Sequence, residues 1–203
     1  MRTIAAACGL LSLLVLAVAA IGGGLAYPDY DPLRQYISEL GATGATTGPA
    51  VSLAFMASGA LLTAFWLMCI ALFPKSPLLI IGWGLSALNG LGLFFGGVFP
   101  CDFQCSLASP SPAAMLHDLL GGIGYLCGIV GVLVVGLAMR RQAGGRGLFR
   151  AALLCGLPAA MAIWLIHPGF EFYGAAQRVV EVALAAWTIA VVMALRRPTG
   201  TPA

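Results

Sequence analysis

Charged residues are scarce in this chain of 203 residues, in which Lys, Arg, Asp and Glu together make up only 8%. A soluble domain carries roughly 25% charged residues, so this chain cannot cover a water-exposed globule with charge. The same scarcity excludes an intrinsically disordered chain, a nucleic-acid-binding protein and a small secreted disulfide scaffold. The mean hydropathy of +0.99 indicates an integral membrane protein whose surroundings are the lipid bilayer.

Long apolar runs account for most of the chain. A helix that crosses a hydrocarbon core of about 30 Å needs about 20 apolar residues, and barrel strands would alternate apolar and polar residues instead. The qualifying segments are 4–26, 49–73, 78–98, 116–139, 149–166 and 177–195. We therefore expect an all-α membrane domain over residues 1–203, with six transmembrane helices in three hairpins and a flexible tail at 198–203.

The first apolar run also has features of a secretory signal, namely Arg2 near its start and small residues at Ala17 and Ala19. However, the uncharged stretch Ile4–Ala26 exceeds the usual apolar core of about 7–15 residues in a signal peptide. The length favours an uncleaved first helix.

Basic residues are divided unequally between the two ends of the predicted bundle. One end has Arg2, Lys75, Arg140, Arg141, Arg146, Arg150, Arg196 and Arg197, whereas the other has only Arg34 and Arg178. Because cytoplasmic loops carry an excess of Lys and Arg, we expect both termini in the cytoplasm and the protein in the cell (inner or plasma) membrane. All seven acidic residues and both histidines lie toward the opposite, outer end.

The first outer loop carries the signals of a short helix. Asp31 can cap it, Pro32 suits its first position, and Gly41 suits its exit. Apolar residues at spacings of three and four alternate with polar ones, including Ser38 and Glu39, so an amphipathic interfacial helix over 32–40 is expected. It would lie on the outer leaflet or roof the bundle.

Polar residues at the outer end form the candidate site. The candidate catalytic residues are Asp102, His117 and Glu181, and the candidate ligand-binding residues are Ser38, Glu39, His167, Gln177 and Arg178. Ionisable groups within the membrane usually face the protein interior, and the spacing of Arg178 and Glu181 predicts a local ion pair. His117 shares a helical face with the small residues Gly121, Gly124, Gly128 and Gly131, so it should face a neighbouring helix. Asn89 is expected to donate an interhelical hydrogen bond.

Three functions fit this cluster. Binding of a lipid or other amphiphile is favoured, because acids and histidines gather at head-group height beside apolar helices. An intramembrane hydrolase or lipid-modifying enzyme is the first alternative, with His117 and Asp102 for proton transfer and Ser38 as nucleophile. A transporter is the second, although no charge lies at mid-bilayer and no pair of broken helices is evident. The same residues could also form only an ion-paired lid.

No cofactor is expected, but zinc stays open. His117, His167 and Asp102, with Glu39 or Glu181, would supply enough ligands, yet no two histidines have the spacing of a zinc-binding helix. Cys101 and Cys105 lie in an outer loop, where an oxidising environment favours a disulfide that would enclose Asp102. Free thiols or metal ligation by these two cysteines, and a homo-oligomer, also stay open.

Three motifs together resemble the bacterial and archaeal domain-of-unknown-function 998 membrane family. They are Tyr36-Ile37-Ser38-Glu39-Leu40-Gly41, Phe99-Pro100-Cys101-Asp102, and His117-Asp118 before a glycine run. The resemblance covers nearly the whole chain, implies the six-span fold, and suggests Ser38, Glu39, Asp102 and His117 as positions to test. A more distant likeness to the Frag/DRAM/Sfk group of eukaryotic six-span proteins suggests a lipid-linked role.

Overall fold

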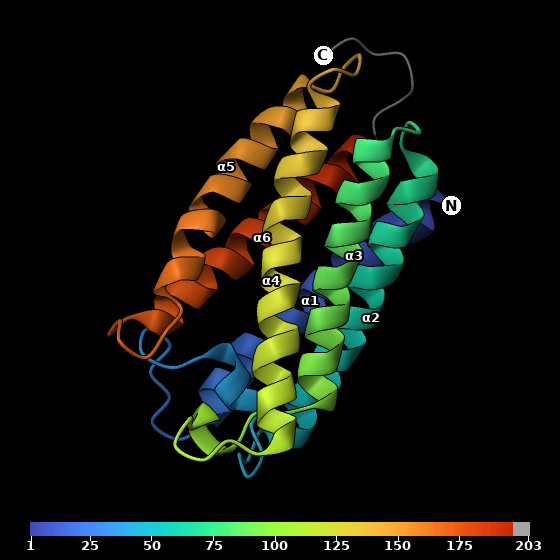
Figure 1. The fold of residues 1–203 in the computed structure, drawn as a ribbon. Coiled ribbons are helices and arrows are strands. Elements are labelled where there is room, and N and C mark those ends of the chain that lie inside the picture. Colours follow the sequence, from blue (N-terminus) through green and yellow to red (C-terminus); the bar gives the residue numbers. More distant parts are fainter. Residues whose placement is uncertain (197–203) are drawn as a thin grey trace.

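The computed structural model describes residues 1–196, so the predicted tail at 198–203 lies outside the described residues. Its long helices are α1 (Arg2–Ala26), α2 (Gly48–Leu72), α3 (Pro77–Val98), α4 (Pro112–Met139), α5 (Arg146–Ala162) and α6 (Tyr173–Arg196) (Figure 1). All six spans, α5 with its 3-10 extension, are long and apolar enough to cross a membrane. The described residues contain no strand. The prediction of an all-α, six-span protein is confirmed.

The helix bounds follow local capping signals. Helix α4 begins well before the predicted Leu116, because Ser111 caps it by accepting a hydrogen bond from the Ala114 backbone N–H (3.2 Å), and a proline suits the first helical position. Helix α5 ends at Ala162 and continues as the 3-10 helix η3 (Ile163–Leu165). Two further 3-10 helices, η1 (Ile37–Gly41) and η2 (Phe103–Cys105), lie in the loops.

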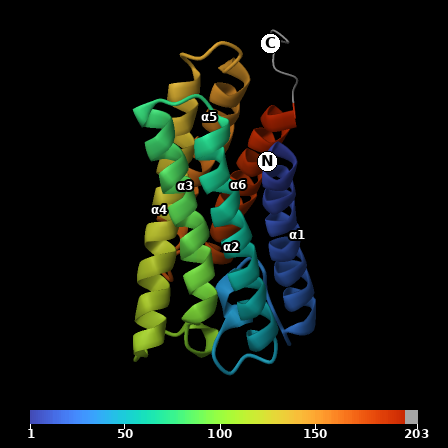
Figure 2. The same ribbon diagram turned by 90° about the vertical axis from the view of Figure 1, so that its right-hand side faces the viewer.

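The six helices form a closed ring in sequence order. Each helix contacts the next along the chain, and α6 returns to contact α1 (Figure 2). By contrast, α4 and α6 touch little across the ring. The centre of the ring is lined by residues of every long helix except α5.

Small residues allow α3 to approach its neighbours closely. A Cβ atom on Gly59 of α2 would lie 2.3 Å from the Phe94 backbone nitrogen, and one on Gly124 of α4 would lie 3.0 Å from the Gly92 Cα. In lipid, such close backbone approach replaces the hydrophobic driving force between helices. The predicted role of the α4 glycine stripe is confirmed at Gly124, Gly128 and Gly131, but Gly121 has nothing within 4 Å of a Cβ position.

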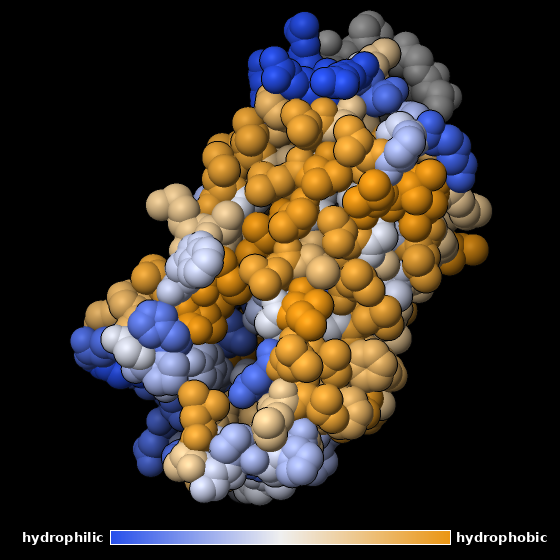
Figure 3. Space-filling view, in the orientation of Figure 1, coloured by the Kyte–Doolittle hydropathy of each residue, from blue (hydrophilic) through white to orange (hydrophobic). Residues whose placement is uncertain are grey.

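The bundle has two chemically different ends. We call the end formed by segments 27–47, 99–111 and 166–172 the loop end, and the end that carries Arg2, Lys75, Arg140, Arg146 and Arg196 the arginine end. Figure 3 shows hydrophilic atoms at both ends and a broad hydrophobic surface between them. Leu154 and Met161, at 77% and 74% exposure, belong to this surface. Such exposed apolar side chains suit contact with lipid rather than water.

Candidate functional site

The first long loop folds into a lid over the bundle, and it differs from the predicted helix over 32–40. Residues Asp31–Gln35 form a turn, with the Gln35 N–H bonded to the Asp31 carbonyl (2.8 Å), and helical structure resumes only in η1. Tyr36 interrupts the helix with an extended backbone (φ −66°, ψ 150°), which its N–H stabilises by donating to Glu39 Oε1 (2.9 Å). Ile37 and Leu40 of η1 pack against Val51 and Phe55 of α2, so the roof of the bundle is the observed one of the two proposed positions.

Glu39 faces the interior of the lid, contrary to the predicted polar outer face. Its side chain is buried, with 2% of the residue exposed, and its second carboxylate oxygen accepts from Gln35 Nε2 (2.8 Å). Burial raises the pKa of Glu39, although the hydrogen bonds from Tyr36 and Gln35 oppose the change. Both carboxylate oxygens of Glu39 thus accept hydrogen bonds from residues of the lid, and Glu39 stabilises the lid. It does not line the cavity described below.

The lid is bound to the start of α6 and to the α5–α6 loop. Arg34 forms ion pairs with Glu171 (2.7 Å) and Asp31 (3.0 Å). Arg178 donates to the Gln35 carbonyl (3.0 Å) and to the Tyr30 hydroxyl (2.6 Å). The predicted ion pair between Arg178 and Glu181 is therefore wrong, because the guanidinium reaches away from the bundle toward the lid.

Cys101 and Cys105 form the predicted disulfide, with their Cα atoms 5.0 Å apart. The ring encloses Asp102, whose Oδ2 accepts from the Ser111 backbone N–H (2.7 Å) just before α4. This hydrogen bond, with a second from the Ser111 side chain, lowers the pKa of Asp102. The disulfide also contacts the lid, since Ser38 Oγ lies 3.4 Å from Cys105 Sγ. It thus joins the α3–α4 loop to the lid.

A cavity of about 100 Å³ lies beneath the lid in the centre of the helix ring. Its loop-end wall is polar and includes Ser38, His117, Tyr125, Gln177 and Glu181. Its deeper walls are largely apolar and include Leu13, Leu16, Leu62, Trp66, Val132 and Trp187. Figure 3 shows a hollow with hydrophilic atoms inside it, between α4 and the lobe that the α5–α6 loop forms with the lid.

A chain of hydrogen bonds connects the lid backbone to Glu181. The Ile37 N–H donates to Gln177 Oε1 (2.7 Å), and Gln177 Nε2 donates to the Tyr125 oxygen (3.1 Å). The Tyr125 hydroxyl in turn donates to Glu181 Oε1 (2.5 Å). Such a chain, with every donor assigned, holds the carboxylate in one position.

His117 faces α3, as predicted. Its Nδ1 lies 2.8 Å from the Phe99 carbonyl oxygen and 3.2 Å from that of Gly96, at the C-terminal end of α3. Since a carbonyl oxygen only accepts, Nδ1 must carry the hydrogen, which leaves Nε2 without a hydrogen-bond partner among the described residues. Asn89 also lines the cavity, but the predicted interhelical hydrogen bond is wrong, because none joins its side chain to another residue within 1–196.

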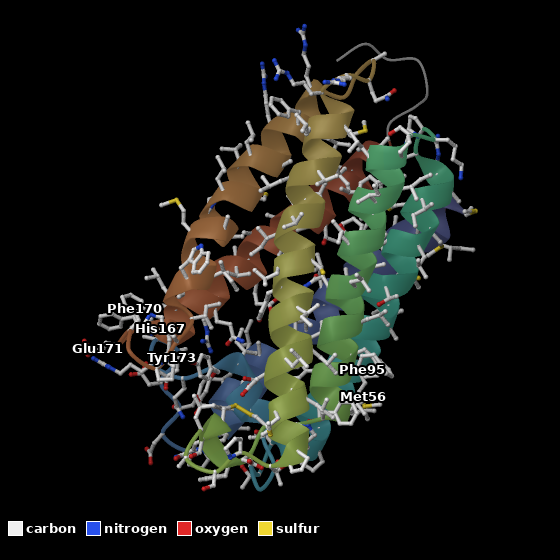
Figure 4. All side chains as sticks on the ribbon, in the orientation of Figure 1. Met56, Phe95, His167, Phe170, Glu171 and Tyr173 are labelled. Carbon is white, nitrogen blue, oxygen red and sulfur yellow. A yellow bond between two sulfur atoms is a disulfide. The ribbon has the colours of Figure 1, made fainter. Side chains whose placement is uncertain are left out.

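The candidate residues thus divide into two groups. Ser38, His117, Gln177 and Glu181 line one cavity, whereas Asp102, Glu39 and Arg178 hold the loops and the lid. His167 projects from the α5–α6 loop at the edge of the molecule, where its Nδ1 accepts from the Gly169 N–H (Figure 4). The proposed zinc ligands do not assemble, since no group of three or more His, Cys, Asp or Glu able to hold a metal is found within residues 1–196.

Tyr125 and Gly121 are among the cavity residues that sequence reasoning did not assign to a site. Tyr125 lies within an apolar stretch, where an aromatic residue is ordinarily a packing residue, and no spacing rule links it to Glu181 on another helix. Gly121 was assigned to helix packing, yet it lines the cavity. The signal that could have found Gly121 was its place at the end of the glycine stripe, one turn from His117.

These features define an integral membrane protein with six apolar helices and a lidded internal cavity. The model of a family described as "Protein of unknown function (DUF998)" matches residues 6–194, and the chain belongs to this family. The resemblance seen in the sequence motifs is thereby confirmed, while the likeness to the Frag/DRAM/Sfk group stays a prediction. No curated protein and no solved structure has a significant match to the chain.

Proposed function

We propose that the protein binds a lipid or similar amphiphile, with its head group in the cavity beneath the lid. The main support for this proposal is that one cavity within the bundle has a polar wall at the loop end and largely apolar walls farther from it. Ligand sites of this kind combine apolar linings with a few convergent polar groups that orient the ligand. The exposed apolar surface of the bundle supports this proposal, because it suits contact with the lipid from which such a ligand would come.

The size of the cavity limits what it can enclose. A volume of about 100 Å³ corresponds to roughly three water molecules in the liquid. It accommodates a small head group or a short length of chain, so the remainder of an amphiphile would extend into the bilayer. We propose that this part of the amphiphile leaves the cavity at the hollow beside α4 that Figure 3 shows.

Gly121 supports entry by this path. It lines the cavity, and a Cβ on it, or on its neighbour Gly122, would have no atom within 4 Å. A glycine in a helix costs about 1 kcal/mol relative to alanine, and close helix packing does not account for either position. At Gly121, which lines the cavity, the absence of a side chain leaves this volume free for a ligand.

The cavity end of the molecule faces away from the cytoplasm in this proposal. The arginine end carries Arg2, Lys75, Arg140, Arg146 and Arg196, and cytoplasmic loops are rich in such residues. The bound amphiphile would therefore come from the outer leaflet of the cell membrane.

The test is lipid analysis of Gly121→Leu protein against a matched control. Leucine at position 121 would project into the cavity, so we expect loss of lipids that co-purify with the native protein in mild detergent. Gly84→Leu is the control, because Gly84 also has open space at its Cβ position but does not line the cavity. If Gly121→Leu protein folds and retains the same bound lipids as Gly84→Leu protein, amphiphile binding in this cavity is wrong.

A further inference from the structure

Resting on the proposed function, we infer that the head group bound in the cavity is a positively charged amine, as in an amphiphile with a primary ammonium group. The inference concerns the carboxylate of Glu181, which lines the cavity beside Tyr125 and Gln177. It follows from the direction of the hydrogen bonds that reach this carboxylate, and from the charges and acceptors that surround it.

The backbone of the lid determines the direction of the hydrogen-bond chain. An N–H can only donate, so the bond from Ile37 (2.7 Å) requires that Gln177 turns its oxygen toward the lid and its NH₂ toward Tyr125. The Tyr125 oxygen accepts from Gln177, and its hydroxyl hydrogen is therefore directed at Glu181 Oε1. Glu181 Oε1 is therefore an acceptor in this chain.

Among the described residues, no Arg or Lys forms an ion pair with Glu181. Within residues 1–196, every ion pair between an Arg or Lys side chain and a carboxylate involves Arg34, with Asp31 or Glu171. Arg178 is on the same helix, but its guanidinium donates to the carbonyls of Gln35 and Gly174 and to Tyr30. The cavity lining itself contains no Arg or Lys. A carboxylate without a countercharge inside a membrane protein is costly, and a cationic ligand would remove that cost.

Other groups around the cavity supply the acceptors that an ammonium needs. An ammonium group has three N–H donors and no acceptor, and it needs several acceptors to replace water. Glu181 Oε2, His117 Nε2 and the Asn89 amide oxygen all belong to residues that line the cavity, and none of the three has a hydrogen bond to another described residue. A phosphate or carboxylate head group would meet the negative charge of Glu181 without an Arg or Lys to offset it.

The experiment compares two probes of equal chain length, dodecylamine and dodecanol, on purified protein in a non-ionic detergent at neutral pH. At this pH the amine is charged and the alcohol is neutral. We expect the native protein to bind the amine about ten-fold more tightly, as suits a hydrogen bond to a charged group. In Glu181→Gln protein the preference should fall to near unity, while binding of the alcohol persists.

Asp118→Asn is the matched control, because Asp118 is an exposed carboxylate at the same end of the bundle and does not line the cavity. It should keep the full preference for the amine. Equal binding of both probes by native protein, or an unchanged preference in Glu181→Gln protein, would overturn the inference and leave amphiphile binding standing. Failure of native protein to bind either probe would instead count against the proposed function. The native comparison needs no variant, so it decides the matter even if Glu181→Gln protein does not fold.

Discussion

Tyr125 and Glu181 are joined by a 2.5 Å hydrogen bond that connects α4 to α6 on the wall of the central cavity. These two helices are not neighbours in the ring and touch little elsewhere. The bond therefore lies where α4 and α6 have few other contacts to hold their positions. Its partners on the Tyr125 side continue to the lid through Gln177, which links the lid to the cavity wall.

Replacing Tyr125 with Phe should destabilise the protein, because the substitution removes a donor from Glu181 and an acceptor from Gln177. Each interhelical bond lost costs about 1 kcal/mol, so the loss of both corresponds to a fall in Tm of about 4–8 °C for a chain of this size. Tyr27→Phe is the control, since the Tyr27 hydroxyl is buried without a hydrogen-bond partner among the described residues. A thermal unfolding experiment in detergent in which both variants lose the same stability would contradict this account.

The disulfide between Cys101 and Cys105 should stabilise the loop end. In the loop-entropy model, so small a ring contributes about 2 kcal/mol, so Cys101→Ser/Cys105→Ser protein should unfold about 4–8 °C below the native protein. Reductant should lower the Tm of native protein toward that of the variant and leave the variant unchanged. Alkylation with mass analysis checks the pairing, because Cys8, Cys69, Cys127 and Cys155 are the free cysteines. Six modified cysteines in unreduced, unfolded protein would show that the bond is absent.

Glu39 should make stability depend on pH. Burial raises its pKa above the ordinary value of 4.5, so the folded state holds this proton more tightly than the unfolded state does. The resulting stabilisation is complete below about pH 4.5 and is lost as the pH rises through the folded-state pKa. The Tm of native protein relative to Glu39→Gln protein should therefore fall between pH 4 and pH 7.

Asp118→Asn is the comparison for this pH experiment, because Asp118 lies exposed at the same end of the bundle and forms no ion pair with another described residue. Its Tm difference from native protein is measured over the same pH range, and this reports a change common to any carboxylate-to-amide substitution. A difference for Glu39→Gln that rises with pH, or stays constant, would be opposite to what burial of this carboxyl requires.

Gly59 and Gly84 should respond in opposite ways to alanine. A Cβ at position 59 would lie 2.3 Å from the Phe94 nitrogen and 2.6 Å from the Gly90 carbonyl oxygen, so α2 and α3 would have to separate. We expect a loss of about 1–3 kcal/mol, as for other overpacked contacts. At position 84 the added methyl meets no atom within 4 Å, and the helix propensity of alanine should leave stability unchanged or slightly raised. Comparable losses at both positions, measured by thermal unfolding, would refute the close approach of α2 and α3.

The orientation in the membrane can be tested independently of the ligand. Two reporters are used, one that is active only in the cytoplasm and one that is active only outside it. We expect the first to be active when fused after Arg196, and the second to be active when inserted beside Ser109 in the α3–α4 loop. This result follows from the concentration of arginines at the opposite end of the bundle. The reverse pattern of activities would mean that the lid and the cavity face the cytoplasm.

The sequence by itself determined the six helices and the composition of the two ends. An uninterrupted apolar run of about 20 residues can satisfy its backbone hydrogen bonds in lipid only as a helix, so the spans were readable without knowledge of their neighbours. The place of Cys101 and Cys105 in one outer loop likewise indicated their disulfide, and the glycines at 124, 128 and 131 indicated close packing.

Only the tertiary structure decided which polar residues share the cavity. In the sequence, Glu39 and Arg178 are polar residues at the outer end of the bundle, just as Gln177 and Glu181 are. The fold nevertheless directs the first pair into the lid and the second pair into the cavity wall. The reason is physical. A side chain's neighbours on other helices depend on how each helix is rotated and how the ring closes, and a polar group turns toward whichever buried partner the lid backbone offers. The periodicity of a single helix contains neither the rotation of that helix within the ring nor the position of the lid backbone.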